Sequence, residues 1–113
     1  MQDDVQGMGA QRPLSPSDRK LCEREYVRGA DLFKKALNQY STSENDYQKK
    51  EFQSVMDKAM DVLNHSASDL KRQELIKQNQ LIAKDYKEYK QNPDAYMKEK
   101  LTQDLETAKE KLG

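Results

Sequence analysis

The sequence predicts an all-α protein, folded as an elongated antiparallel bundle of four helices. Apolar residues recur every three or four positions over long segments, which is the spacing of one helix face. Nowhere do they alternate over four or more positions, as they would in a half-buried strand. Only short polar segments separate the helical patterns, and short connections favour antiparallel neighbours.

Composition narrows the function classes. The 113 residues include twenty basic and twenty acidic ones. The resulting net charge of zero argues against a strongly basic nucleic-acid-binding protein. No apolar run is long enough to span a membrane and no signal-peptide pattern begins the chain, so we expect a cytoplasmic protein without membrane contact. One Cys and one His exclude an internal disulfide and a Cys/His zinc cluster. Leu, Ile, Val and Phe total only 19 residues, which predicts a thin core.

A flexible tail is expected at residues 1–14, because this segment contains Gly and Pro but no periodic apolar pattern. Residues 15–113 are predicted to form a single helical domain. Its first helix is expected over residues 16–40, with Ser15 as the N-cap and Pro16 at the first helical position. The apolar face of this helix consists of Cys22, Tyr26, Ala30, Phe33, Leu37 and Tyr40.

Gly29 lies beside that apolar face, where the small residue is expected to permit the close approach of another helix. Residues 26–37 resemble the second helix of a tetratricopeptide repeat, with Gly29, Phe33 and Ala36 at its small, aromatic and small positions. The resemblance covers one helix, and no second copy of the repeat follows. We therefore interpret the resemblance as convergent helix packing.

The second helix is expected over residues 44–65, after an N-cap at Ser43. Ser66 followed by Asp69 resembles a capping box and predicts a break before a third helix over residues 67–91. Because no Gly or Pro enforces this break, one long kinked helix, and hence a bundle of three, is the alternative. The apolar side of the second helix carries Phe52, Val55, Met56, Ala59, Val62 and Leu63.

The fourth helix is expected over residues 93–112, with Pro93 at its first position. Asn92, Pro93 and Asp94 are similar to the turn of bacterial secretion-needle subunits, although the similarity covers only these three residues. The narrow apolar stripe of this helix consists of Met97, Leu101, Leu105, Ala108 and Leu112.

No catalytic or metal-binding motif is present in the sequence, so we expect a non-enzymatic protein without a cofactor or a metal. Cys22 lies on the apolar face of the first helix and is interpreted as a small buried hydrophobe. His65 is interpreted as the last residue of the second helix, where the helix dipole favours its charged form. An enzyme that uses Cys22 or His65 is the least favoured hypothesis.

The third helix is expected to carry the function, because its apolar residues are spread over several faces. Its heptad spacing of Leu75, Ile82 and Tyr89 is interrupted by Gln78 and Asp85, which argues against a coiled-coil seam. We therefore predict a surface shared with another protein or a second copy, as in a homodimer. The protein would be an interaction module, such as an adaptor, a chaperone or an assembly component. The predicted interface residues are Leu70, Ile76, Leu81, Tyr86 and Tyr89.

A local basic excess on the same helix provides the alternative hypothesis. Residues 71–92 contain six basic residues against three acidic ones, with two tyrosines between them. Basic residues interleaved with aromatic ones bind single-stranded nucleic acids through charge and stacking. The alternative nucleic-acid face consists of Lys71, Arg72, Lys77, Lys84, Lys87 and Lys90.

Overall fold

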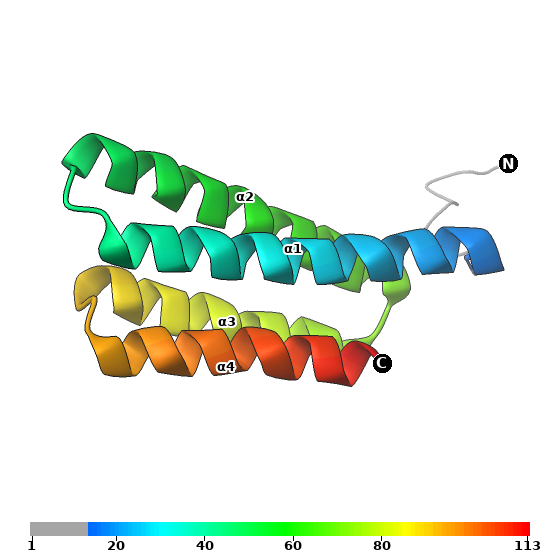
Figure 1. The fold of residues 1–113 in the computed structure, drawn as a ribbon. Coiled ribbons are helices and arrows are strands. Elements are labelled where there is room, and N and C mark those ends of the chain that lie inside the picture. The colour runs from blue at the N-terminus through cyan, green and yellow to red at the C-terminus, as the bar shows by residue number, and fades with distance from the viewer. Residues whose placement is uncertain (1–13) are drawn as a thin grey trace, which may run out of the picture.

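The computed structural model describes residues 14–113, which form four helices and no strand (Figure 1). They are α1 (Pro16–Thr42), α2 (Asp46–Leu70), α3 (Gln73–Gln91) and α4 (Ala95–Leu112). The predicted all-α fold with four helices is confirmed. Of the predicted tail, residues 1–13 lie outside the described part of the chain, and Leu14 packs, partly buried, against the core.

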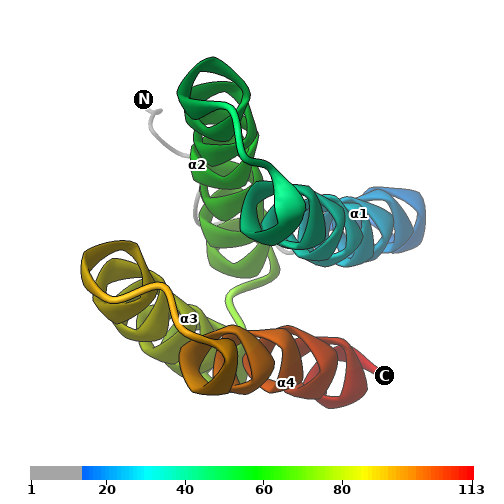
Figure 2. The ribbon, with the colours of Figure 1, turned by 60° about the vertical axis from the view of Figure 1, so that its left-hand side comes forward.

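Successive helices run in opposite directions, from right to left and back in the view of Figure 1, so each is antiparallel to the next along the chain. In the view of Figure 2, α1 and α2 form one hairpin and α3 and α4 form the other. α1 lies beside α4, and α2 lies beside α3. The bundle measures 55 × 27 × 22 Å, which confirms the elongated shape.

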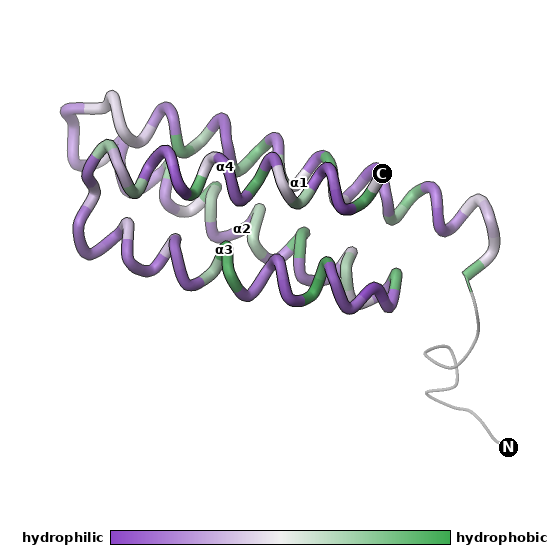
Figure 3. The backbone as a smooth tube through the Cα atoms, turned by 90° about the horizontal axis from the view of Figure 1, so that it is seen from below, coloured by the Kyte–Doolittle hydropathy of each residue, from purple (hydrophilic) through white to green (hydrophobic). Residues whose placement is uncertain are grey.

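All four helices contribute to one core. Hydrophobic residues recur at intervals along each helix between hydrophilic ones (Figure 3), and the recurring positions meet at the centre of the bundle. Two aromatic pairs connect the hairpins edge to face: Phe33 with Tyr86, and Tyr40 with Tyr89. The largest fully buried apolar side chains are Tyr26, Phe33, Leu37, Met56, Leu63, Leu75, Ile82, Tyr89, Leu101 and Leu105.

Side-chain N-caps begin α1 and α4. The Ser15 hydroxyl accepts a hydrogen bond from the Asp18 main-chain N–H at 3.1 Å, which confirms the predicted cap. The Asp94 carboxylate accepts from the main-chain N–H of Met97 at 2.8 Å, so α4 begins after Asp94. The prediction that Pro93 is the first helical residue of α4 is therefore wrong, because Pro93 precedes the cap.

The connection between α1 and α2 lies two residues later than the sequence predicted. The hydroxyls of Ser41 and Thr42 donate to the main-chain oxygen of Asn38 at 2.8 and 3.2 Å, and both residues stay in α1. Ser43 is consequently the C-cap of α1 and not the N-cap of α2. Asn45 takes that role, since its side-chain oxygen accepts from two main-chain N–H groups of the first turn.

The predicted break at residues 66–69 is wrong. α2 continues to Leu70 because Ser66, Ala67 and Leu70 are buried, and this burial outweighs the local preference of Ser for a cap. α2 and α3 are nevertheless separate helices. Lys71 adopts the left-handed conformation with a φ of 55° at the end of α2, and Arg72 is the extended residue before α3.

Buried polar bonds connect the two hairpins. The Tyr26 hydroxyl of α1 donates to the side-chain oxygen of Asn79 at 2.8 Å, and the Asn79 amide donates to the main-chain oxygen of Leu63 at 2.9 Å. Burial raises the pKa of Tyr26 to about 12, so its hydroxyl stays protonated and continues to donate. Asn79 of α3 therefore fixes its own helix against both α1 and α2.

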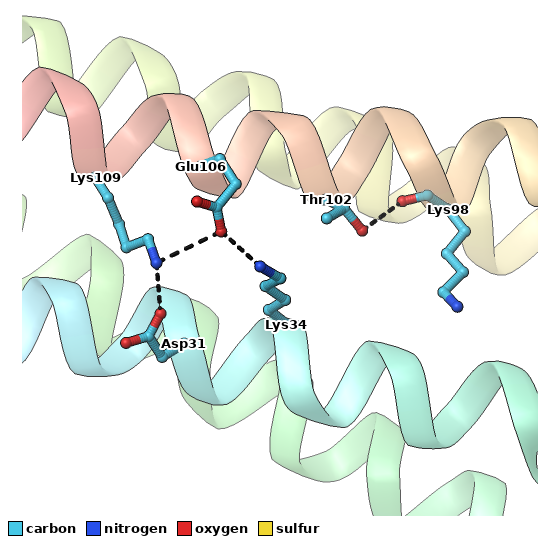
Figure 4. Close-up of polar contacts among 6 residues, drawn as sticks. All are labelled: Asp31, Lys34, Lys98, Thr102, Glu106 and Lys109. Carbon is cyan, nitrogen blue, oxygen red and sulfur yellow. Dashed lines mark hydrogen bonds and ion pairs between the residues drawn. The ribbon is translucent and has the colours of Figure 1, made fainter.

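Ion pairs also join α1 to α4, as Figure 4 shows. Lys34 lies 2.8 Å from Glu106, and Lys109 lies 2.8 Å from Asp31 and 3.4 Å from Glu106. The hydrogen bond from Lys34, with the nearby charge of Lys109, lowers the pKa of Glu106. The pKa of Lys109 is raised, chiefly by its hydrogen bond to Asp31.

Candidate functional site

A groove lies between α1 and α2 on the outer surface of their hairpin. Two adjoining hollows of about 310 and 280 Å³ form it, and Glu25 and Val62 line both. We call this surface the α1/α2 groove. Its apolar lining consists of Leu21, Cys22, Gly29, Leu32 and Val62, and its polar lining of Glu25, Arg28, Asp61, His65, Ser66 and Asp69.

Gly29 brings the two helices close together in this groove. A Cβ atom at Gly29 would lie 3.0 Å from Cγ1 of Val62 and 3.4 Å from the main-chain oxygen of Ala59. The predicted close helix approach at Gly29 is thus confirmed. On either side of Gly29 along α1, Leu21 is 54% exposed and Leu32 is 39% exposed. The groove therefore presents apolar surface to solvent.

Cys22 lies at the acidic end of the groove. The residue packs against the core but stays partly exposed. Burial raises the pKa of the Cys22 thiol, and the carboxylates of Asp69, Asp18, Glu25 and Glu23 raise it further. The thiolate is the reactive form of cysteine, so this environment lowers the reactivity of Cys22. Of these four, Glu25 and Asp69 line the groove, where Asp61 is a third carboxylate and Arg28 a basic residue.

His65 lines the groove together with Cys22. It is exposed in the interior of α2, because α2 continues beyond it to Leu70. The interpretation of His65 as the last residue of its helix is therefore wrong. Across residues 14–113, His, Cys, Asp and Glu side chains form no group of three or more that could hold a metal ion.

A wider and more open groove of about 750 Å³ lies between α1 and the end of α4. Its apolar lining is Val27, Leu32 and Leu112. Asp31 at the edge of this groove forms an ion pair with Lys109 of α4. The charged lining of the groove is mixed, with four basic and two acidic residues: Lys20, Glu23, Arg24, Arg28, Asp31 and Lys35.

The predicted interface residues of α3 and its surroundings are not brought together on the surface. Leu70, Tyr86 and Tyr89 are buried, and Ile76 packs, partly buried, against the core. Only Leu81 is exposed, with 38% of its surface accessible. The reason is that α3 packs against both α2 and α4, so one core accommodates more of its faces than the sequence pattern indicated.

The predicted basic face is likewise divided. Arg72 pairs with Glu74 and donates to the main-chain oxygens of Leu112 at 3.1 Å and Lys111 at 2.6 Å, which holds it against the end of α4. Lys90 lies over the ring of Tyr86 and Lys71 ends α2. Exposed on α3 at helical spacing are Lys77, Lys84 and Lys87.

A buried carboxyl pair lies between α3 and α4. Asp85 is fully buried, and Nζ of Lys100 lies 3.5 Å from its Oδ1. Burial raises the pKa of Asp104 to about 7, and a hydrogen bond that its protonated form donates to Asp85, together with the negative charge of Asp85, contributes to the rise. The amide of Gln78 donates to the main-chain oxygen of Asp104 at 2.9 Å. Asp104 therefore keeps its proton in the folded chain up to about pH 7.

Comparison with known proteins gives no relative. No protein-family model matches the chain, and no curated protein or solved structure is significantly similar to it. Within residues 14–113, none of the helices has the length and apolar character needed to cross a membrane. Inferences about function therefore depend on the surface chemistry of the bundle.

Proposed function

We propose that the chain is a non-enzymatic interaction module that binds a protein segment in the α1/α2 groove. The observation that supports this function best is the exposure of Leu21 and Leu32 beside Val62, which is itself only partly buried. Exposed apolar groups that line a groove with a polar edge are typical of protein-binding surfaces. The α1/α2 groove, and not the predicted set of residues on the third helix, is thus the proposed binding groove.

The dimensions of the groove favour a helical segment. Leu21 and Leu32 are separated by three turns of α1, which corresponds to about 16 Å at a rise of 1.5 Å per residue. A partner helix of about three turns would cover this length, with apolar side chains at helical spacing on one face. Asp61 and Asp69 on α2 favour basic residues beside that apolar face.

An enzymatic function has less support. The α1/α2 groove contains both Cys22 and His65, which are the residues such a function would require. However, burial and the surrounding carboxylates raise the pKa of the Cys22 thiol, whereas a nucleophilic cysteine needs a lowered pKa.

Nucleic-acid binding also has less support. Tyr86 and Tyr89 are buried, so their rings are not available to stack on bases. Lys77, Lys84 and Lys87 remain as an exposed basic face without an exposed aromatic residue among them.

Site-specific photo-crosslinking tests the proposed function. A photoreactive amino acid at Leu21 or Leu32 is expected to capture a protein in cells of the native host, and mass spectrometry identifies the crosslinked peptide. The matched control places the same probe at Tyr47 or Tyr96, which are 70% and 73% exposed but lie away from the groove. Equal capture at the control positions, or none at the groove, would contradict the proposal.

A further inference from the structure

The outer face of α3 carries an exposed leucine among basic residues. Leu81 is 38% exposed. Lys77 lies one turn before it and Lys84 one turn after it, and both lysines are exposed. Residues three and four positions apart share one helix face, so two ammonium groups flank Leu81. Glu88 lies two turns after Leu81 on the same face, with Lys87 beside it, so the basic character of this face depends on Lys77 and Lys84.

The α1/α2 groove has the complementary chemistry. Leu21 and Val62 line it beside the carboxylates of Asp61 and Asp69. Glu25 contributes a further carboxylate where the two hollows meet, although Arg28 lies 3.7 Å from it. An apolar side chain between two ammonium groups fits apolar surface beside several carboxylates.

We infer that the segment bound in the α1/α2 groove is the outer face of α3 from a second copy of this chain, an inference that rests on the proposed function. Leu81 of one copy packs against Leu21 and Val62 of the next. Lys77 and Lys84 lie opposite the carboxylates of the groove.

The two surfaces lie on opposite sides of the bundle. In Figure 2 the α1/α2 hairpin occupies the upper part and α3 the lower left, on the other side of the core. One molecule cannot bring its own α3 face into its own groove. The contact is therefore heterologous, with each copy using its groove once and its α3 face once, and it builds rings or open chains.

The N-terminal segment is a poorer occupant. Residues 1–13 contain two acidic residues and one basic residue, and this charge does not complement an acidic groove. The exposed α3 face has the opposite sign and includes an apolar side chain at its centre.

The contact is expected to be weak and sensitive to salt. One leucine and two or three lysines on a single helix face form an interface at the low end of the size range, typical of transient association. Pairs of exposed charges lose most of their attraction when the Debye length falls to about 3 Å at 1 M salt. Sedimentation velocity on the full chain is expected to show concentration-dependent self-association at low salt and monomers at high salt.

Two single variants test the surfaces separately. Leu81→Glu removes the apolar centre of the α3 face, and Leu21→Lys places a cation in the groove that repels the lysines of that face. Both positions are exposed, so both variants are expected to fold, which circular dichroism and thermal unfolding verify. Each is expected to weaken self-association by about tenfold or more. The control variant Tyr96→Glu, at a position 73% exposed, is expected to associate as the wild type does.

Mixing the two variants tests the heterologous geometry. The Leu81→Glu copy retains an intact groove and the Leu21→Lys copy retains an intact α3 face. Together they are expected to form a 1:1 dimer that grows no further, because the two remaining surfaces are both defective. A mixture that stays monomeric while the wild type associates would overturn the inference, since it would indicate contacts between like surfaces.

Other outcomes assign the surfaces differently. A wild type that is monomeric at all concentrations overturns the inference, and the proposed function survives if a groove probe still captures another protein. Deletion of residues 1–13 that converts a monomer into an associating chain assigns the groove to that segment. Binding of single-stranded RNA or DNA that is lost in a Lys77→Glu, Lys84→Glu variant assigns the α3 face to nucleic acid.

Discussion

The α1/α2 hairpin contains four of the five buried alanines of residues 14–113, whereas α3 and α4 contain four of the five buried polar residues. The first hairpin also has Gly29, where the helices approach so closely that a Cβ would lie 3.0 Å from Val62. The second places Asp85 and Asp104 in its interface, with Lys100 3.5 Å from Asp85.

The difference separates two ways of joining antiparallel helices. Small residues permit close packing, whose strength depends on shape and hardly on pH. Buried carboxyl groups contribute little net stability, but they make the contact depend on the positions of protons and charges. We therefore expect the stability of the α1/α2 hairpin to depend on side-chain volume and the stability of the α3/α4 hairpin to depend on pH.

The largest expected effect is on the volume-sensitive hairpin. Gly29→Leu places a side chain where even a Cβ is tight, and it is expected to lower the free energy of unfolding by about 3 kcal/mol. Urea unfolding followed by circular dichroism measures this loss. Gln39→Leu, on the exposed surface of the same helix, is the control and should change stability by less than about 0.5 kcal/mol. Equal effects of the two variants would show that α1 and α2 do not pack closely at Gly29.

The next largest loss of stability is expected from breaking the ion pair of Lys100 with the buried Asp85 in the second hairpin. Lys100→Met leaves the buried Asp85 without its cation and is expected to lower the free energy of unfolding at neutral pH. The double variant Lys100→Met, Asp85→Asn removes both charges and should recover most of the loss. A double-mutant cycle by urea unfolding gives the coupling. Additive losses would mean that the two side chains do not interact.

Asp104 gives the second hairpin a pH dependence. Its ordinary pKa of 3.8 is raised to about 7 in the folded chain, so between these values the folded chain holds a proton that the unfolded chain has lost. Stability is therefore expected to fall as the pH rises from about 4 to about 7, by at most about 1.4 kcal/mol per pH unit, and to level off above.

Comparison with Asp104→Asn isolates this contribution, because asparagine cannot ionise. At about pH 8 the free energy of unfolding of the variant should exceed that of the wild type by about 1 kcal/mol or more. At about pH 4 the two values should be equal. Urea unfolding across this range measures the difference. A constant difference at every pH would exclude titration of Asp104 as the cause.

The smallest change in the free energy of unfolding is expected from the ion pairs between the two hairpins, which Figure 4 shows. Glu106→Gln removes two partly exposed ion pairs and should cost about 0.5 kcal/mol at neutral pH. Since the pKa of Glu106 is lowered from 4.5, its contribution is present above that value and is lost as the pH falls through the lowered pKa. This is the opposite direction to Asp104. A salt titration should reduce the effect of Glu106→Gln further.

Much of the fold is predictable from local patterns. The spacing of Tyr26, Phe33 and Leu37 identified the buried face of α1, and Ser15 identified its start. The end of α2 could not be found in this way, because Ser66 has the local character of a capping residue. Its burial against the core is a property of the assembled bundle.

The candidate site was less accessible to sequence reasoning. One usable signal was present, since Leu21 and Leu32 are apolar residues that lie off the buried stripe of α1. That Cys22 and His65 line one groove depends on the register between α1 and α2, which neither helix encodes alone. Asp85 interrupted an apolar repeat, but its pairing with Asp104 likewise requires the register of α3 against α4.

Arg72 lies on the two-residue connection between the hairpins and holds the main-chain oxygens of Lys111 and Leu112. The last turn of α4 therefore cannot fray without releasing the connection that orients the two hairpins. Amide protons at the end of α4 and at the start of α3 should then exchange with solvent as one cooperative unit. Through Arg72, local unfolding at the end of α4 is therefore coupled to local unfolding at the junction of the two hairpins.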